Sequence, residues 1–202
     1  MIQLSKKIIL GLLLCVSAFA ASAQPGPQSD AGKVPEGATP LNIRDSILGN
    51  AAAFTSQPLL LCAGTKDGSN AMTIGWISIG QTWFSPCVTV YVADKRFTRK
   101  YLEQCDYFTV MTFKDGKTIQ YMGSHSGRDG DKAKALGLHT LYTDNGAAYY
   151  AEADKVIECR IMYGAQYRKE NIRDPRVAQF YEHFPDGIHW EYIGRITKAW
   201  KN

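Results

Sequence analysis

Short runs of β-branched and aromatic residues, each ended by a turn signal, recur along this chain and restrict its fold more than any other feature. Runs with this composition, which is typical of strands, lie at 59–64, 72–83, 88–93, 107–113, 156–163 and 190–200. Short helical segments are expected at 41–50, 98–105, 117–123, 126–137 and 174–184. Because long helices do not alternate with the strands, a doubly wound parallel sheet is disfavoured. The sequence predicts a mainly β fold with short helices, in which the strands form a barrel.

Local signals predict where several of these segments begin and end. Asn42 is a suitable cap for the first helix, and Asp174 followed by proline opens the last one. Gly137 is placed to end the helix before it. Turn residues at 66–70 separate two strands, and the Asp-Gly pair at 115–116 is expected to close the strand that precedes it.

The first 23 residues have the pattern of a secretory signal. Lys6 and Lys7 precede an apolar stretch at 8–19, and the small residues at 21–23 suit a signal peptidase that cuts after Ala23. The chain is therefore expected to be exported, to the periplasm. A lipoprotein signal with Cys15 as the lipidated residue is the alternative, but a leucine precedes Cys15 where a small residue is normally found.

Composition then divides the mature chain into two parts. Residues 24–40 are rich in proline and glycine and predict a flexible tether, whereas residues 41–202 predict one globular domain. Without Lys6 and Lys7 the formal net charge falls from +4 to +2, which is too small to indicate a nucleic-acid-binding protein.

Cysteines and histidines give no sign of a metal site. There is no C-x-x-C pair, and the four histidines lack the spacing of metal ligands. Three of the four mature cysteines lie in apolar runs, which favours free thiols over disulfides, although pairing stays open. The four are Cys62, Cys87, Cys105 and Cys159. Walker, G-x-S-x-G and G-x-G-x-x-G patterns are absent, so P-loop, α/β-hydrolase and Rossmann functions have no support.

Three polar segments have the chemistry of a ligand site. "NAMTIGW" (70–76) places an amide and a hydroxyl at the mouth of a strand. "ADKRFTRKYLE" (93–103) surrounds Thr98 with cations at an expected helix start, where Thr98 could both cap the helix and hold a phosphate. "SHSGRDGDK" (124–132) is a second polar loop suited to an anion. Each segment also has an ordinary interpretation, as a turn, a solvated basic helix face or a local ion pair.

Taken together and in this order, the segments resemble the flavin reductase-like proteins of the flavoredoxin type. The stretches that carry the resemblance are "NAMTIGWISIG", "VYVADKRFTRKYLEQCDYFTV", "SGRDGDKAKALGL" and "VIECRI", within about Leu59–Trp200. The resemblance implies a split β-barrel that binds FMN and forms a homodimer, with the flavin near the subunit interface.

The resemblance also implies a set of cofactor-binding residues. Asn70 would meet the flavin ring, with the backbone of the next three residues nearby and Trp76 beside the ring. Thr98 and neighbouring cations would hold the phosphate, and the polar loop would add further charge there. The full expected set is Asn70, Ala71, Met72, Thr73, Trp76, Lys95, Arg96, Thr98, Lys100, Ser126, Arg128 and Lys132.

The function expected from this resemblance is that of an FMN-binding oxidoreductase. The flavin would carry the chemistry, so no catalytic side chain is required. NAD(P)H is a candidate donor, but an export signal leaves the donor open, and a redox partner protein is an alternative. Two further hypotheses remain: a non-catalytic exported flavin carrier, and an exported β-barrel binding module with a lost flavin site.

Overall fold

A computed structural model describes residues 33–202; the expected signal at 1–23 and the tether residues 24–32 lie outside this range. The strands are β1 (Thr39–Pro40), β2 (Leu59–Thr65), β3 (Gly68–Ile74), β4 (Ile77–Thr82), β5 (Ser85–Ala93), β6 (Tyr107–Thr112), β7 (Thr140–Tyr142), β8 (Ala148–Tyr150), β9 (Lys155–Gln166) and β10 (His189–Lys201). The helices are η1 (Ile43–Leu48), α2 (Ala51–Thr55), α3 (Arg99–Leu102), α4 (Gly116–Ser124), α5 (Lys132–Ala135), η2 (Lys169–Asn171) and α6 (Pro175–His183).

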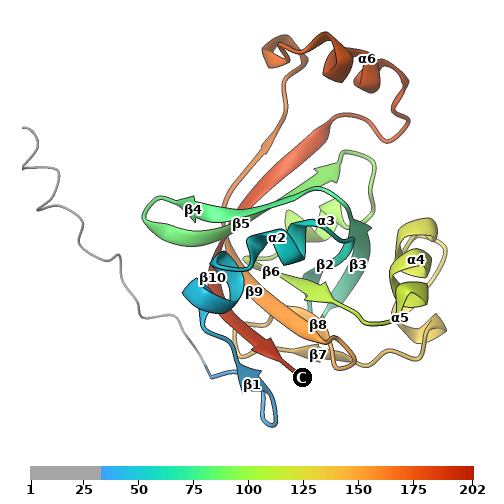
Figure 1. The fold of residues 1–202 in the computed structure, drawn as a ribbon. Helices are drawn as coiled ribbons and strands as arrows, with labels where there is room; N and C mark the ends of the chain where they lie inside the picture. Colours follow the sequence, from blue (N-terminus) through green and yellow to red (C-terminus); the bar gives the residue numbers. More distant parts are fainter. Residues whose placement is uncertain (1–32) are drawn as a thin grey trace, which may run out of the picture. The chain divides into compact units, whose positions relative to one another are not determined.

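One antiparallel sheet organises the domain (Figure 1). Its strand order is β3-β2-β6-β9-β10-β5-β4, and β1 pairs with the end of β10. Met72 of β3 shares one buried cluster with Val88 and Val90 of β5, so strands far apart in the sheet order enclose a common core. This mainly β architecture with short helices confirms the predicted fold class, and it is that of a split barrel.

A second core lies between the sheet and the elements that cover it. Met111 on β6 and Trp200 on β10 pack with Met122 of α4 and Tyr150 of β8. This cluster fixes α4 and the β7–β8 hairpin against the barrel. It thereby positions the polar loop at 124–132, which follows α4 directly.

Residues 167–188 connect β9 to β10 and carry η2 and α6; we call them the arm. In Figure 1 the arm stands at the upper end of the two long strands. Asp174 caps α6 by accepting the N–H of Arg176, and proline occupies the first turn, as the sequence predicted. Among residues 33–202 no helix combines the length and the apolar character needed to cross a membrane.

Two sequence predictions about the elements are wrong, and one hairpin was missed. Residues 72–83 do not form one strand, because the chain leaves β3 at Gly75 and Trp76 before β4 begins. Asp115 does not close a strand by a turn; it caps α4 by accepting the N–H groups of Lys117 and Thr118. The hairpin of β7 and β8 was not predicted, since each of its strands has only three residues.

Two connections have unexpected structure. In the segment expected to be a tether, Thr39 and Pro40 pair with Lys201 and Trp200 of β10, so this end of the segment is part of the fold. Trp83 and Phe84 form the two-residue turn between β4 and β5, with φ of 48° and 60°. Both side chains are exposed, by 57% and 77%.

The four cysteines within residues 33–202 are free thiols. Cys62, Cys87 and Cys159 are buried, and Cys105 is half-buried. Burial raises the pKa of the Cys62 thiol to about 12, so it stays protonated at neutral pH.

Candidate functional site

A polar cavity of about 180 Å³ lies between β3, the segment after β5 and the loop after α4. It brings together segments that are far apart in the sequence. Eight of the twelve predicted site residues line this polar cavity: Asn70, Met72, Lys95, Arg96, Thr98, Ser126, Arg128 and Lys132. The three polar segments singled out from the sequence therefore meet in one place.

Backbone donors without partners are concentrated around the polar cavity. The N–H groups of Phe97, Thr98, Ser126 and Gly127 donate no hydrogen bond within residues 33–202, although all four residues line the cavity. Backbone N–H groups in folded proteins are nearly always paired, with protein, water or ligand. Four unpaired donors on two facing loops suit an anion with several oxygens, such as a phosphate.

A short side-chain hydrogen bond joins β3 to the segment before α3. Asn70 Nδ2 donates to Thr98 Oγ1 at 2.7 Å, and both residues are buried. The predicted capping role of Thr98 is wrong, because Thr98 has helical backbone angles and its side chain makes no capping bond to α3. The asparagine amide holds the hydroxyl instead, which leaves the Thr98 O–H free to donate toward the cavity.

The cations of the polar cavity are fixed by the loops around it. Arg96 pairs with Asp186 at 3.2 Å, and Lys95 Nζ donates to the carbonyl oxygen of Pro185 at 2.9 Å. Arg128 donates to the carbonyl oxygen of Lys95 at 2.9 Å. These bonds connect the arm, the segment after β5 and the loop after α4. The cavity is thus lined by positioned positive charge.

Lys132 lies deeper than the sequence suggested. Its side chain is buried, and Nζ donates to the carbonyl oxygens of Met122 and His125 at 3.0 and 3.1 Å. Desolvation, reinforced by nearby Arg96, lowers the pKa of Lys132 to about 8. Lys132 therefore ties the start of α5 to the end of α4, and its side chain lines the polar cavity.

Two predicted residues line neither the polar cavity nor the cavity that adjoins it. The Lys100 ammonium lies over the rings of Phe97 and Tyr101, at 4.4 and 4.7 Å from their centroids. Ala71 is 1% exposed and packs in the second core. Lys100 can still contribute long-range charge, whereas Ala71 can contribute only its backbone.

A second cavity of about 320 Å³ adjoins the first, and we call it the ring cavity. Met72, Arg96 and Asp186 line both, so the two form a continuous surface. Thr73 and Trp76, which belong to the expected set, also line the ring cavity. The Thr73 hydroxyl is committed to the carbonyl oxygen of Ile119 on α4. At this place β3 is the end strand of the sheet, which leaves one backbone edge without a neighbouring strand among the described residues.

The rest of the ring cavity was missed by sequence reasoning. His189 at the start of β10 and the arm residues Phe180 and Phe184 line it, together with Tyr91 of β5. The ring centroids of Trp76 and His189 are 4.5 Å apart, and those of Trp76 and Phe180 are 5.7 Å apart. No spacing in the sequence connects these residues, because the arm must fold back on the barrel to bring them together.

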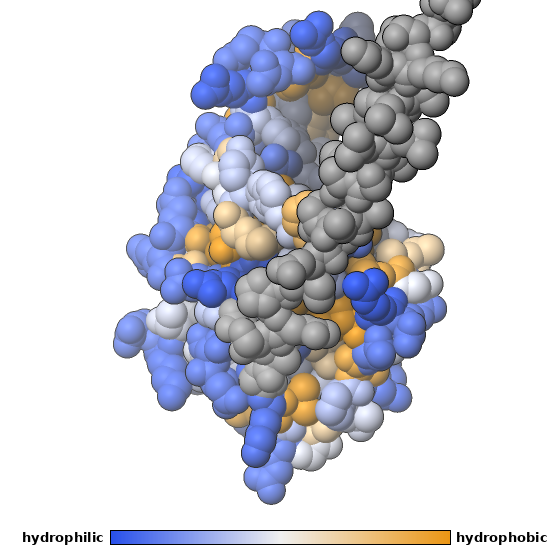
Figure 2. Space-filling view, turned by 90° about the vertical axis from the view of Figure 1, so that its left-hand side faces the viewer, coloured by the Kyte–Doolittle hydropathy of each residue, from blue (hydrophilic) through white to orange (hydrophobic). Residues whose placement is uncertain are grey.

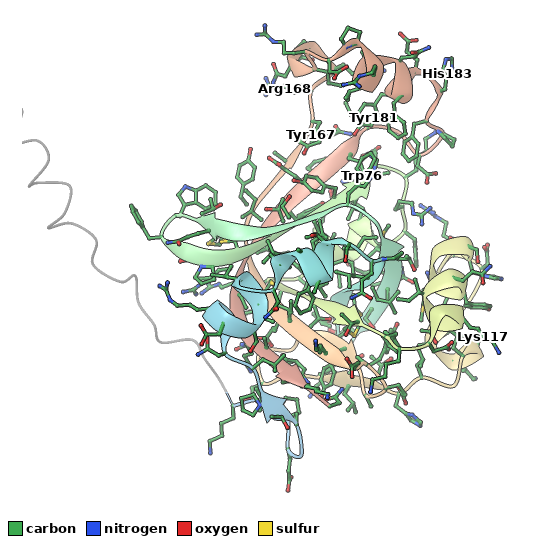
Figure 3. The ribbon with its side chains drawn as sticks, in the orientation of Figure 1. Trp76, Lys117, Tyr167, Arg168, Tyr181 and His183 are labelled. Atoms are coloured by element: carbon green, nitrogen blue, oxygen red, sulfur yellow. The ribbon has the colours of Figure 1, made fainter. Side chains whose placement is uncertain are left out.

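Beneath the arm lies a third and larger hollow, the arm groove, of about 1310 Å³. Figure 2 shows a hydrophobic recess below the hydrophilic outer surface of the arm. Trp76 and Phe180 line both the arm groove and the ring cavity. In Figure 3 Trp76 and Tyr181 lie between the arm and the barrel, whereas His183 lies at the far end of α6. Within residues 33–202 no cluster of histidine, cysteine and carboxylate side chains could hold a metal ion.

Comparisons with known proteins identify the family and support the fold. The model of the flavin reductase like domain matches residues 51–202. No curated protein has a sequence that matches the chain. Among solved structures, flavoredoxin from Methanosarcina acetivorans is 19% identical with a TM-score of 0.55, and the match covers 85% of this chain and 75% of that one.

Two further structures have the same fold. An FMN-binding domain of a flavin reductases-like enzyme from Shewanella baltica OS155 is 17% identical with a TM-score of 0.57, covering 84% of this chain and 79% of that one. Flavin reductase HpaC complexed with NADP⁺ is 9% identical with a TM-score of 0.53, covering 77% and 86%. At these sequence identities the structures show a shared fold.

Proposed function

Because this chain belongs to the family of flavin reductase like domains, we propose that it is an FMN-binding oxidoreductase that passes electrons from a reduced donor through the bound flavin. One observation carries the proposal. A cavity with unpaired N–H donors and positioned cations continues into a cavity walled by aromatic side chains. FMN has the same two parts, a phosphate and a planar ring.

The residues present fit this cofactor. The phosphate would accept from the unpaired N–H groups at 97–98 and 126–127, with Arg96 and Arg128 balancing its charge. The ribityl chain would cross the surface of Met72 that both cavities share. The ring would lie against the open edge of β3, with Trp76 beside it. FAD would require additional room for its adenosine part, and FMN is the form for which the two cavities suffice.

The flavin, when bound, supplies two-electron chemistry, and the protein contributes binding, orientation and exclusion of water. Trp76 and Phe180 form the partition between the ring cavity and the arm groove, so they control access to the ring. Arg96 places a positive charge beside the ring cavity, where it would stabilise negative charge on a bound flavin.

Reduced nicotinamide is the proposed donor, supported by the presence of NADP⁺ in the related flavin reductase HpaC. We further propose that residues 1–23 direct export, as their sequence pattern predicts, and that two copies associate, as the resemblance implies. An exported enzyme would meet little nicotinamide, and then a redox partner protein would supply the electrons.

The test begins with the visible absorption spectrum of the purified protein after FMN loading and desalting. We expect a retained flavin band, and reduction of that band by NADH or NADPH. Bound flavin without turnover would support the electron carrier instead. A folded protein that retains no flavin would refute the proposed function.

Thr98→Ala tests the site itself. Loss of a hydrogen bond to a charged phosphate should weaken FMN binding by about 1.5–3 kcal/mol. Thr143→Ala is the matched control, because Thr143 is a buried threonine that lines neither cavity. Equal FMN affinity in the two variants would contradict the assignment of the polar cavity.

A further inference from the structure

The arm groove and the ring cavity are separated by a thin wall of side chains. The groove has a volume of about 1310 Å³ and the ring cavity one of about 320 Å³. Trp76 and Phe180 belong to the wall, since both line the two spaces. The groove and the ring cavity therefore meet at these side chains.

One hydrogen bond crosses the wall. Tyr181 of α6 lines the arm groove, and His189 of β10 lines the ring cavity. The Tyr181 hydroxyl and His189 Nδ1 are 3.0 Å apart, and both residues are buried. Figure 3 shows Tyr181 reaching from the arm toward the barrel. The bond therefore connects the groove side to the ring side.

The imidazole of His189 is held in a fixed orientation. It stacks on Phe184, with the two ring centroids 5.2 Å apart, and its ring centroid lies 4.5 Å from that of Trp76. Nδ1 is occupied by Tyr181, and Nε2 makes no hydrogen bond within residues 33–202. Nε2 is not among the fully buried polar atoms of these residues that lack a partner. When Nδ1 accepts from the phenol, Nε2 carries the proton and offers it to the ring cavity.

We propose that Tyr181 and His189 form a proton relay between the arm groove and the ring cavity, which rests on the proposed flavin function. As a hydride donor delivers two electrons, the Nε2–H bond of His189 breaks and its proton passes to the acceptor atom in the ring cavity. The Tyr181 O–H bond breaks as Nδ1–H forms, and the phenol oxygen takes a proton from hydronium in the groove. One proton enters per hydride, and the reverse sequence returns it when the electrons leave.

Burial and the surrounding charges set the protonation states of His189 and Tyr181. Desolvation lowers the pKa of His189; Asp186 opposes this and Arg96 adds to it. Burial raises the pKa of the Tyr181 phenol. Tyr91 is the other titratable group on the ring cavity. At neutral pH the imidazole is thus neutral and the phenol protonated, which a relay by tautomer exchange requires.

The first test needs no flavin. Long-range ¹⁵N–¹H spectra of the purified protein should show His189 as the Nε2–H tautomer, and Tyr181→Phe should remove that preference. A wild-type His189 protonated at Nδ1 would overturn the relay. His183→Gln, on the exposed end of the same helix, is the matched control and should leave the His189 signals unchanged.

The second test uses the FMN-loaded protein. At saturating FMN, Tyr181→Phe and His189→Gln should slow reduction of the flavin by a hydride donor roughly tenfold or more and change its pH profile and solvent deuterium effect. FMN affinity should stay the same in Tyr181→Phe, because Tyr181 does not line the ring cavity. Unchanged reduction in both variants, with FMN retained, would overturn the relay and leave the proposed function standing. A wild-type protein that binds no FMN would refute the proposed function and the relay with it.

Discussion

Single residues decide whether the polar cavity keeps its shape, and Gly127 is the clearest case. A Cβ at this position would lie 2.2 Å from Asn70 Oδ1 and 2.6 Å from the ring of Phe97. Both neighbours line the cavity, and Asn70 also holds Thr98. A glycine is therefore required here by close approach, at the point where two of the unpaired N–H groups face the ligand space.

Gly127→Ala should weaken FMN binding about tenfold or more, since displacing the loop removes hydrogen bonds to the phosphate. FMN titration followed by fluorescence measures this. Gly116→Ala is the control, because a Cβ there meets nothing within 4 Å. If Gly127→Ala binds FMN as tightly as the control, the loop does not contact the phosphate.

Lys132 should make FMN affinity depend on pH. In the free protein its pKa is lowered to about 8, chiefly by desolvation. A bound phosphate favours the charged amine, so above pH 8 binding must include uptake of a proton. Affinity should therefore be constant from pH 7 to about 8 and then fall, by at most about tenfold per pH unit.

The Lys132 prediction is checked by FMN titration between pH 7 and 9.5. Lys132→Met should bind more weakly at pH 7 and lose the decline above pH 8. A decline of the same slope in Lys132→Met would show that another group is responsible.

At the scale of elements, the β4–β5 turn carries the most evident strain. Its two central residues, Trp83 and Phe84, have the left-handed backbone that glycine and asparagine adopt easily. For other residues this conformation costs roughly 1–2 kcal/mol each. Replacing Trp83 by Asn and Phe84 by Gly should raise the free energy of unfolding by about 1–2 kcal/mol. Urea unfolding measures this, and a lower stability would mean that the aromatic contacts of the turn outweigh its strain.

Helices and strands could be predicted where residues within the element itself determine its structure. β5 and β6 were found because β-branched and aromatic residues dominate them, and α6 because Asp174 and the following proline mark its start. The break at Gly75 and Trp76 was missed because the apolar pattern continues across it. The turn at 83–84 was missed because neither residue favours positive φ.

In the candidate site, too, local features could be predicted and tertiary contacts could not. The three polar segments were found because each contains several hydrogen-bonding side chains within a few residues. Their shared cavity depends on tertiary contacts such as the bond from Asn70 to Thr98, which no local signal encodes. His189 and Phe180 were missed because their position in the ring cavity depends on how the arm folds back. Only the resemblance to a family linked the segments in advance.

For the whole molecule, one buried ion pair joins several parts of the chain. Glu158 of β9 is completely buried, and its Oε2 lies 3.9 Å from Lys198 Nζ of β10. Asn145 and Thr197 donate to the other carboxylate oxygen. Lys198 also donates to the carbonyl oxygen of Lys33. The pair therefore ties the start of the described chain to the centre of the sheet.

Lys198→Met should lower the free energy of unfolding by about 3–5 kcal/mol, because it leaves the Glu158 carboxylate buried without a cation. Adding Glu158→Gln should recover most of that loss, since the uncompensated charge is then removed. Thermal or urea unfolding of both variants measures the difference. A double variant no more stable than Lys198→Met would show that packing, not charge, sets the cost.

The burial of the thiols has a practical consequence. Alkylating reagents cannot reach Cys62 or Cys159 while the sheet is intact, because both side chains are 0% exposed. Half-buried Cys105 offers the readiest point of attack in the folded chain. The rate at which mass spectrometry detects modification of Cys62 and Cys159 would therefore report how often the barrel opens. The natural thiols thus allow opening of the barrel to be followed without any substitution.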